Sequence, residues 1–503
     1  MTAARGRAHR HRGRRVLPWA LGMIVLSGCS ATAGPPNQAA SGAASGSTSP
    51  SVSVSVSASA SASEVPVVTA PPMTTAPTSR WRPSQAATRP SSRTPSRTGP
   101  TTSTRAPGSD AGRPPAVAAA PTTGFRITAA DGRRAQQQLA GMSVREQAAL
   151  VLMPAASSVD ATVTSVRYGG VILMGSNGVV DGTGGGTPAE VRDYVGDLQA
   201  QRPAAWGPML VAVDQEYGDV ARLVNGFTEF PGASEIASSG RDDAVSMTER
   251  AAAAAAQEMR AVGVGIDFAP DADVLPADGE SAIGDRSYGT DPDTVASFVA
   301  AAVRGYQSGG VAATLKHFPG IGGLSSDTHE VLPTVQQSCA AWNTSARVPF
   351  AAGIDAGAAL VMTGHVLFPA AGVSDEPTSL SPTAVDDVLR GKGSAGCTGL
   401  GYTGVSVSDS FEMAPVTEAF SAEEAAWRGL AAGQDLILLP ASPARAIDGI
   451  AAAVQSGQLP ASRLRDAAGR ILTLQSATSN VVVPPLSVVG SPEHRALADA
   501  ARG

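Results

Sequence analysis

Short apolar segments alternate with alanine-rich amphipathic segments along the chain from about residue 124 onward. Eight apolar runs stand out: 148–155, 169–177, 208–218, 263–274, 311–320, 359–369, 402–411 and 434–440. Nearly continuous apolar runs are typical of parallel strands that are buried on both faces. The intervening segments predict helices at 188–202, 242–261, 291–308, 381–390, 417–432 and 443–456. This alternation predicts an α/β fold, a (β/α)8 TIM-type barrel. A doubly wound open sheet is the alternative, although no glycine-rich phosphate-binding fingerprint follows the first strand.

Polar residues follow several of these runs at the point where each strand is expected to end. They are Asp214-Gln215-Glu216, Asp271, Lys316-His317, His365 and Asp409. One polar residue after a strand is most often a cap or a turn former, but that explanation is poor for five strands together. In a barrel the carboxyl ends of the strands converge on one face, where active sites form. The pattern therefore predicts a polar site at that face.

Residues 1–122 differ in composition from the rest of the chain. They contain 13 Arg, no Lys and 2 acidic residues, whereas the remainder carries 24 basic and 41 acidic side chains. The formal charges are therefore +11 and −17, and such an acidic folded region argues against a nucleic-acid partner. The Ser/Thr/Pro/Ala-rich tract at 30–122 has few large apolar side chains to bury. We therefore expect a disordered linker there and a single folded domain at 123–503.

The first 29 residues have the form of an export signal. An arginine-rich start precedes an apolar run from Val16 to Leu26, which is too short to span a membrane as a mature helix. The run ends in Leu-Ser-Gly-Cys, which resembles the signal of bacterial lipoproteins, where the cysteine becomes the lipidated first residue. The resemblance implies export and a lipid anchor at Cys29 on the outer face of the cell membrane, with no other membrane contact. An ordinary secretory signal with an unrelated cysteine is the alternative.

Two further cysteines, Cys339 and Cys397, lie in the folded region. Outside the cytoplasm such a pair can form a disulfide, and two cysteines are too few for a zinc site of their own. The sequence does not show whether their Cα atoms lie within bridging distance, so the disulfide stays open. The histidines lack a recognisable spacing of metal ligands, and we expect neither a metal nor a cofactor.

Three groups of polar residues suggest chemistry. Asp409 ends an apolar run, where an isolated aspartate is most often a helix N-cap. Asp327 and His329 lie two apart in a loop rich in Gly and Ser. A carboxylate there can orient the imidazole and raise its basicity for acid/base catalysis, although such a pair is more often a surface turn. Asp214 and Arg222 can grip a hydroxylated ligand or form a structural ion pair.

In chain order, these segments resemble glycoside hydrolase family 3, and within it the single-domain bacterial β-N-acetylglucosaminidases. DQEYGDVARLVNGFTEFPG (214–232) resembles the block DQEGGRVQRL…F…P. GIDFAPDADV (265–274) with IGDRSYG (283–289) resembles NFAPVxDV…IGxRSFG. LKHFPGIGGLSSDTHEVLP (315–333) resembles KHFPGHGxxxxDSHxxLP and keeps the spacing of eleven between the lysine and the aspartate. Segments at 360–369, 376–382, 402–413 and 432–440 follow in family order, so the resemblance covers about residues 124–475.

The resemblance implies a role for each matching position. Asp409 stands where the family's nucleophile attacks the anomeric carbon and forms a covalent glycosyl-enzyme. His329, held by Asp327, stands where this branch places its acid/base. Other members often take a carboxylate acid/base from a further α/β domain, for which we expect no room in this chain. The positions that hold the hydroxyl and acetamido groups of the sugar are matched by Asp214, Arg222, Arg286, Lys316 and His317.

Two positions depart from the family blocks. Tyr217-Gly218-Asp219-Val220 stands in place of Gly-Gly-Arg-Val, and Ile321 stands where a histidine often follows Pro-Gly. Both changes leave the catalytic positions intact, but they make the substrate preference of the pocket harder to infer.

The resemblance implies a retaining exo-β-N-acetylglucosaminidase, a monomer whose catalytic barrel spans 123–503. Its substrate would be an amino-sugar glycoside or a muropeptide derived from peptidoglycan. Retaining glycosidases usually use two carboxyl groups, whereas an imidazole, with an ordinary pKa near 6.5, can donate and accept a proton near neutral pH. Three alternatives stay open: a β-glucosidase or broad β-hexosaminidase, a phosphorylase that uses phosphate in place of water, and a non-catalytic lipoprotein that binds wall sugars.

Overall fold

The structure is a computed structural model that describes residues 123–159, 162–175, 179–180 and 185–503. The expected export signal, Cys29 and the linker at 30–122 lie outside the described residues. Among the described residues, none of the helices has the length and apolar character needed to cross a membrane.

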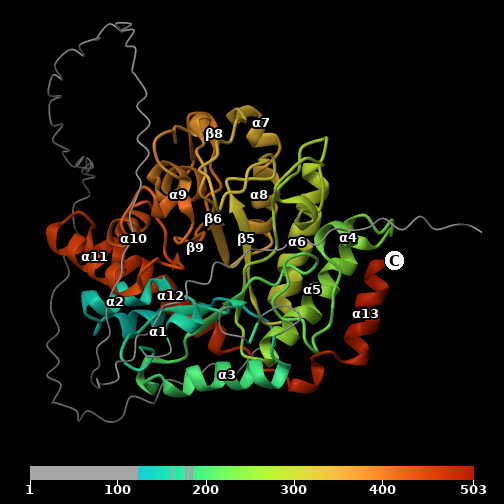
Figure 1. The fold of residues 1–503 in the computed structure, drawn as a ribbon, viewed down its shortest axis with the longest axis horizontal. Helices are drawn as coiled ribbons and strands as arrows, with labels where there is room; N and C mark the ends of the chain where they lie inside the picture. The colour runs from blue at the N-terminus through green and yellow to red at the C-terminus, as the bar shows by residue number, and fades with distance from the viewer. Residues whose placement is uncertain (1–122, 160–161, 176–178, 181–184) are drawn as a thin grey trace, which may run out of the picture. The chain divides into compact units, whose positions relative to one another are not determined.

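Eight parallel strands of the described residues form the centre of the fold (Figure 1). They are β1 (Leu152–Met153), β2 (Gly170–Ile172), β3 (Leu210–Val213), β4 (Ile266–Asp267), β5 (Ala312–Phe318), β6 (Leu360–Thr363), β9 (Val405–Ser408) and β10 (Ile437–Leu438). One ladder runs β2-β3-β4-β5-β6-β9, and β1 pairs with β10. Single parallel bridges join Ala155 to Ile172 and Val407 to Leu436, so the two ladders close into one ring. The predicted α/β barrel is confirmed, and the doubly wound open sheet is excluded.

Helices surround this ring, and four of them fall where the hydrophobic pattern places them: α3 (Pro188–Gln201), α5 (Ala244–Ala261), α6 (Pro292–Ser308) and α11 (Pro443–Ser456). The predicted helix at 381–390 is a π-helix, Thr383–Leu389. The predicted helix at 417–432 is wrong in extent, because the chain forms α9 (Ala414–Thr417) and then α10 (Ala422–Ala431). Ser421 starts α10 afresh by accepting a hydrogen bond from the Glu424 N–H.

Several elements carry no strong signal in the hydrophobic pattern. They are α1 (Ala129–Leu139), α2 (Val144–Leu150), α4 (Ala233–Ala237), α7 (Cys339–Thr344), α8 (Arg347–Asp355), α12 (Ala461–Ser479), α13 (Pro492–Arg502) and the hairpin of β7 (Gly393–Ser394) and β8 (Cys397–Thr398). Between β1 and β2 the described residues contain one short 3₁₀ turn, Ala156–Ser158, in place of a full helix. The barrel therefore departs from a strict alternation of strand and helix at its first unit.

Small residues allow α5 and α6 to pack closely. A Cβ atom on Gly305 would lie 2.4 Å from the Glu249 carbonyl oxygen, and one on Gly309 would lie 2.3 Å from that of Ala253. Such distances are well below van der Waals contact, so only glycine fits at Gly305 in α6 and at Gly309, which directly follows α6. The alanine-rich sequence of α5 supplies the matching shallow surface.

Asp435, just before β10, attaches α12 to the barrel. Its fully buried carboxylate lies 2.8 Å from Arg463 and 3.1 Å from Arg470, both in α12. It also pairs with Arg390, which follows the π-helix. Three cations around one buried carboxylate satisfy a charge that would otherwise be costly to bury. This cluster lies before the strand, whereas the polar residues predicted to form the site lie after the strands.

Candidate active site

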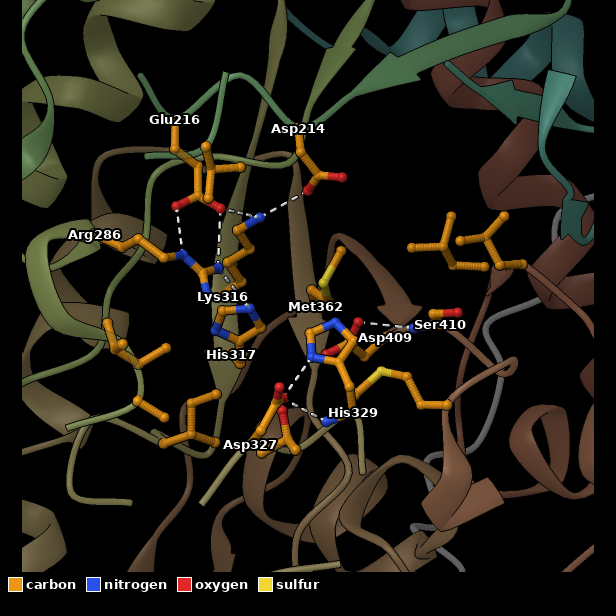
Figure 2. Close-up of a pocket in the computed structure, with 18 of the residues that line it drawn as sticks. Asp214, Glu216, Arg286, Lys316, His317, Asp327, His329, Met362, Asp409 and Ser410 are labelled. Carbon is orange, nitrogen blue, oxygen red and sulfur yellow. Dashed lines mark hydrogen bonds and ion pairs between the residues drawn. The ribbon is translucent and has the colours of Figure 1, made fainter. Parts of the chain in front are cut away.

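A pocket of about 600 Å³ opens where the barrel strands end. Its wall includes residues from β2, β5, β6 and β10, residues that follow β3 and β9, and residues from the loops at 282–286 and 321–329. Figure 2 shows its charged and polar side chains. Every residue that the sequence proposed for catalysis or sugar binding lines this pocket: Asp214, Arg222, Arg286, Lys316, His317, Asp327, His329 and Asp409.

Glu216 links two cations of the pocket wall, Lys316 and Arg286. Its Oε1 lies 2.6 Å from Lys316 Nζ, and its Oε2 lies 2.8 Å from Arg286 Nε. Lys316 Nζ also donates to Asp214 Oδ1 at 2.8 Å. Burial raises the pKa of Glu216, but the charges of Lys316 and Arg286 outweigh burial and lower that pKa to about 2. Burial lowers the pKa of Lys316, yet Asp214 and Glu216 raise it above its ordinary value, so the Glu216–Lys316 pair is charged at neutral pH.

His317 contacts a carboxylate with one ring nitrogen and a guanidinium with the other. Its Nδ1 lies 2.9 Å from Asp273 Oδ2, and its Nε2 lies 3.3 Å from Arg286 Nη2. A guanidinium can only donate, so Nε2 is the acceptor and the ring proton is on Nδ1, which donates to Asp273. The ring of His317 therefore donates to Asp273 through Nδ1, and its Nε2 faces Arg286.

The turn after β5 is held by glycines and by one buried indole. Gly320 has a φ of 112°, a conformation that favours glycine. A Cβ atom on Gly322 would lie 2.2 Å from the Val274 carbonyl oxygen. Trp342 is fully buried, and its Nε1 donates to the Pro319 carbonyl at 2.7 Å. These contacts fix the start of the loop that continues to Asp327 and His329.

Asp409 directly follows β9. Its backbone N–H donates to the Thr363 carbonyl at 2.9 Å, and its Oδ1 accepts from the Ser410 N–H at 2.8 Å. Burial raises the pKa of Asp409, but interactions with the imidazoles of His317 and His365 lower it below its ordinary value. The helix N-cap interpretation of Asp409 is wrong, because the next helix, α9, begins only after Met413. Asp409 is therefore an ionised carboxylate in the pocket.

His365 supports the backbone beside Asp409. Its Nδ1 lies 2.7 Å from Ser379 Oγ, and its Nε2 lies 2.9 Å from the Ser410 carbonyl oxygen. The carbonyl can only accept, so Nε2 carries the proton and Nδ1 accepts from Ser379. Burial lowers the pKa of His365, which keeps the ring neutral. The sequence marked His365 only as a polar residue after a strand, and this contact depends on tertiary structure.

Asp327 and His329 form a hydrogen-bonded dyad on an exposed loop. Asp327 Oδ1 lies 2.7 Å from His329 Nδ1 and accepts the His329 backbone N–H at 2.9 Å. That backbone hydrogen bond is the main reason why the pKa of Asp327 lies below its ordinary value. The side chains are 59% and 69% exposed. The Ala414 N–H donates to the His329 carbonyl at 3.1 Å, which ties the dyad to the segment after Asp409. The dyad orients the ring and leaves Nε2 for proton exchange with a ligand.

Asp214 and Arg222 do not pair with each other among the described ion pairs, because Asp214 binds Lys316 instead. The Arg222 backbone N–H donates to Gln215 Oε1 at 2.8 Å, which fixes the loop after β3. Within the described part of the chain Arg222 has no carboxylate partner, and its Nε has no hydrogen-bond partner. Its charge is therefore available to a ligand, and the structural ion-pair interpretation of Asp214 and Arg222 is wrong.

An apolar surface forms much of the remaining pocket wall, and the sequence connected only Ile321 of its members with the pocket. Its members are Ile172, Met174, Val220, Ile283, Ile321, Leu324, Met362, Met413, Leu438 and Leu439. Leu439 has a φ of 45°, an uncommon conformation for a side-chain-bearing residue. Ile321, where the family block often has histidine, belongs to this surface. The pocket thus combines charged groups with apolar ones, as expected for a ligand that has hydroxyl groups and apolar faces.

Cys339 and Cys397 are bonded to each other, with a Cα–Cα distance of 4.5 Å. The disulfide joins the first residue of α7 to β8. Neither cysteine lines the pocket. Asn343 accepts from the Thr398 N–H at 2.8 Å and donates to the Gly396 carbonyl at 3.0 Å, so hydrogen bonds support the same junction.

The family model of the glycosyl hydrolase family 3 N-terminal domain matches residues 137–474. The chain belongs to glycoside hydrolase family 3. It is 40% identical over 252 residues to a β-hexosaminidase of Stenotrophomonas maltophilia, covering 49% of this chain and 72% of the relative. These findings confirm the resemblance seen in the sequence and identify the protein as a glycoside hydrolase.

Solved structures of this family have the same fold. One is a family 3 β-N-acetylglucosaminidase from Paenibacillus, with a TM-score of 0.64 and 32% identity, covering 72% of this chain and 68% of that one. Another is a β-N-acetylhexosaminidase from Beutenbergia cavernae, with a TM-score of 0.57 and 30% identity, covering 67% of this chain and 99% of that one. The barrel is therefore shared along nearly the whole length of the second structure.

Proposed function

We propose that the protein is a retaining exo-β-N-acetylglucosaminidase with Asp409 as its nucleophile. The observation that carries the proposal is the presence of Asp409 and the Asp327–His329 dyad in one pocket. An ionised carboxylate and a proton donor are the two groups that retaining hydrolysis needs. The relatives and solved structures of similar sequence are named as β-hexosaminidases and β-N-acetylglucosaminidases, which supports GlcNAc as the sugar.

In the proposed mechanism, Asp409 Oδ attacks the anomeric carbon while His329 transfers a proton to the leaving-group oxygen. The bond from carbon to that oxygen breaks, and a glycosyl ester of Asp409 forms. His329 then removes a proton from water, which attacks the anomeric carbon and releases the sugar and the Asp409 carboxylate. Asp327 accepts from Nδ1 and thereby stabilises the imidazolium form of His329, which is present before the first step and is restored when His329 takes the proton of water in the second.

The cations and carboxylates beside Asp409 would hold the sugar hydroxyls and the acetamido group. Lys316 and Arg286 are fixed by Glu216, so their remaining donors point from set positions and lose little freedom on binding. Arg222 adds a charge that the described residues leave unpaired. We propose these residues, with Asp214 and His317, as the sugar-binding set.

Trapping with a 2-fluoro sugar tests the nucleophile. The reagent slows hydrolysis of the glycosyl-enzyme, and peptide mapping should locate the label on Asp409. Asp409→Ala should abolish both labelling and turnover of p-nitrophenyl β-GlcNAc. Label on any other residue would contradict the assignment, and unlabelled protein without turnover would support the alternative of a non-catalytic sugar-binding lipoprotein.

Product analysis distinguishes the proposed hydrolase from its enzymatic alternatives. We expect free GlcNAc from p-nitrophenyl β-GlcNAc and little release from the β-glucoside, with or without phosphate. Faster release from the β-glucoside would support a β-glucosidase. A sugar 1-phosphate formed in phosphate buffer would show a phosphorylase, which the histidine acid/base allows because a neutral imidazole does not repel the incoming anion.

We further propose that the enzyme is a lipid-anchored monomer that acts on peptidoglycan fragments outside the cell membrane. The lipoprotein-like signal ending at Cys29 and the long linker that follows support this location. A flexible linker of 93 residues has a mean end-to-end distance of roughly 50–60 Å, which would let the barrel reach the cell wall. Palmitate labelling in cells should be lost in Cys29→Ala, and persistent labelling would contradict the anchor.

A further inference from the structure

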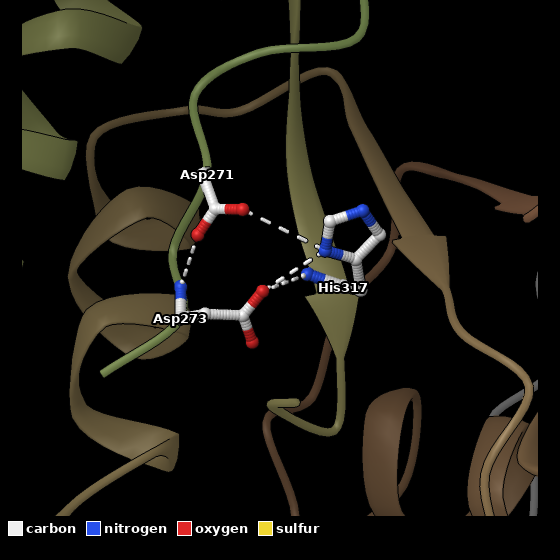
Figure 3. A group of neighbouring side chains, drawn as sticks. All are labelled: Asp271, Asp273 and His317. Carbon is white, nitrogen blue, oxygen red and sulfur yellow. Dashed lines mark hydrogen bonds and ion pairs between the residues drawn. The ribbon is translucent and has the colours of Figure 1, made fainter. Parts of the chain in front are cut away.

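Three buried side chains converge behind the pocket face of His317 (Figure 3). Asp271 and Asp273 follow β4, and His317 lies in β5. His317 Nδ1 lies 2.9 Å from Asp273 Oδ2 and 3.7 Å from Asp271 Oδ2. One oxygen or nitrogen from each residue lies within 4.8 Å of the other two, and the residues are 2%, 0% and 6% exposed.

One carboxylate oxygen of this cluster is buried without a hydrogen-bond partner. Asp271 Oδ1 accepts the Asp273 N–H at 2.8 Å, but Asp271 Oδ2 makes no hydrogen bond with any described residue. The nearest guanidinium nitrogen, of Arg286, is 3.8 Å away, beyond hydrogen-bond range. An unsatisfied buried oxygen is costly, and this one is aimed at the space shared with Asp273 and His317.

Carboxyl groups also outnumber the permanent cations around the cluster. Four neighbouring carboxylates, those of Asp214, Glu216, Asp271 and Asp273, face two permanent cations, Lys316 and Arg286. Glu216 and Asp214 take the short ion pairs of these cations. Asp271 and Asp273 therefore lie beside each other without a short ion pair to either cation, and a divalent cation between them would compensate both carboxyl groups.

We propose that Asp271, Asp273 and His317 form a binding site for one divalent transition-metal ion of the zinc class. Two carboxylate oxygens and one imidazole nitrogen are ligands that zinc takes, with a fourth position open to water. In a tetrahedral site with metal–ligand bonds of about 2.0 Å, two ligand atoms are roughly 3.3 Å apart. The distances from His317 Nδ1 to Asp273 Oδ2 and to Asp271 Oδ2, 2.9 and 3.7 Å, lie on either side of that value. The imidazole favours zinc over calcium or magnesium, which take oxygen ligands.

The ion would change which ring nitrogen of His317 carries the proton. A metal on Nδ1 uses the lone pair of that nitrogen, so the ring proton must reside on Nε2. Without the metal, Arg286 Nη2 donates to His317 Nε2 at 3.3 Å. With the proton on Nε2, both atoms would be donors, so this hydrogen bond would be lost. Zinc should therefore raise the KM for the sugar. This consequence rests on the proposed function, whereas zinc binding itself does not.

Calorimetric titration of zinc chloride into the full chain, stripped with a chelator, tests the site. Zinc can also bind to the exposed Asp327–His329 dyad of the pocket. His329→Ala removes that competing site and is therefore the matched comparison for Asp271→Asn. We expect one tight site in the wild type and in His329→Ala, and affinity lower on the order of 10- to 100-fold in Asp271→Asn. Absence of zinc binding by the wild type, unchanged affinity in Asp271→Asn, or loss in His329→Ala would each overturn the proposal.

Anomalous diffraction from wild-type crystals soaked in zinc gives a test that does not depend on the folding of a variant. The peak should lie between Asp271, Asp273 and His317, and a peak only at the Asp327–His329 dyad would refute the site. The KM for p-nitrophenyl β-GlcNAc should rise with zinc in the wild type and less so in Asp271→Asn. Should the chain fail to hydrolyse this substrate, the proposed function is wrong while the titration and diffraction results still decide the metal site.

Discussion

Lys316 and Glu216 form a buried ion pair, with 2.6 Å between Nζ and Oε1 and side chains that are 3% and 5% exposed. Glu216 also holds Arg286 through two hydrogen bonds of 2.8 and 3.0 Å. One carboxylate therefore fixes two of the cations proposed to bind the sugar. Both carboxylate oxygens of Glu216 are occupied by these contacts, so its main role is to position Lys316 and Arg286.

Glu216→Gln should destabilise the fold and weaken sugar binding. The change leaves two buried cations with less compensating charge, and breaking a buried pair from one side costs about 3–5 kcal/mol. We expect a loss of that order in the free energy of unfolding, measured with urea, and a higher KM for p-nitrophenyl β-GlcNAc. The matched control is Glu424→Gln, whose partner Arg428 is four residues away at 2.8 Å with both side chains about two-fifths exposed. That exposed pair should contribute less than about 1 kcal/mol, and equal losses in the two variants would contradict a special role for Glu216.

Acid should destabilise the wild type through the same residue. Glu216 has an ordinary pKa of 4.5 and a pKa of about 2 in the folded protein. The folded state binds this proton less tightly than the unfolded state, so the stabilisation is fully present above the unfolded pKa. It declines as the pH falls from about 4.5 and is lost below about 2. The free energy of unfolding should therefore fall more steeply over this range in the wild type than in Glu216→Gln, and parallel pH curves would contradict the assignment.

The sequence predicted the barrel because buried parallel strands leave a direct signal, a continuous apolar run. All eight runs contain a strand, although β1, β4 and β10 have only two residues each. Helix ends were less predictable, since the break between α9 and α10 depends on the local cap at Ser421. Helices α12 and α13 pack on the outside of the barrel, and their place depends on tertiary contacts such as Asp435 with Arg463.

The site residues were predictable as a group because the barrel brings strand ends together. Their individual contacts were not, since these join residues far apart in the chain. Asp273 lies 44 residues before His317, and nothing in the spacing links the two. The opposite error occurred with Asp214 and Arg222. Their nearness in the sequence suggested an ion pair, but in the structure Asp214 pairs with Lys316.

Removal of the disulfide should lower stability and leave catalysis nearly unchanged. Cys339 and Cys397 are 58 residues apart, and closing a loop of that length in the unfolded chain accounts for up to about 4 kcal/mol. We expect Cys339→Ala/Cys397→Ala to lose about 2–4 kcal/mol in urea unfolding, with kcat/KM for p-nitrophenyl β-GlcNAc within about threefold of the wild type. Asn343→Ala, which keeps the disulfide but loses the adjacent hydrogen bonds, is the comparison. Superimposable unfolding curves for the double variant and the wild type would show that these hydrogen bonds suffice.

His329→Ala should affect substrates according to how much their leaving groups need a proton. Loss of a general acid typically costs 10²- to 10⁴-fold, and this loss should appear with a poorly activated leaving group such as a second sugar. With p-nitrophenol, which departs readily as the anion, formation of the glycosyl-enzyme should be much less impaired. Measuring kcat/KM for both substrates separates this role from a structural one, because a damaged fold would reduce both equally.

Glu412→Gln is the control for that assignment. Glu412 lines the same pocket and lies three residues after Asp409, and burial raises its pKa, so it is the carboxyl group that competes with His329 for the role of acid. If His329 is the acid, Glu412→Gln should keep the wild-type dependence on the leaving group, and Asp327→Asn should show a weaker form of the His329→Ala effect. If Glu412→Gln instead selectively loses the poorly activated substrate, a carboxyl acid acts here, and the dyad serves only to shape the loop. The orientation of His329 by Asp327 at 2.7 Å favours the first outcome, because an exposed imidazole without that contact would have no fixed direction toward the leaving group.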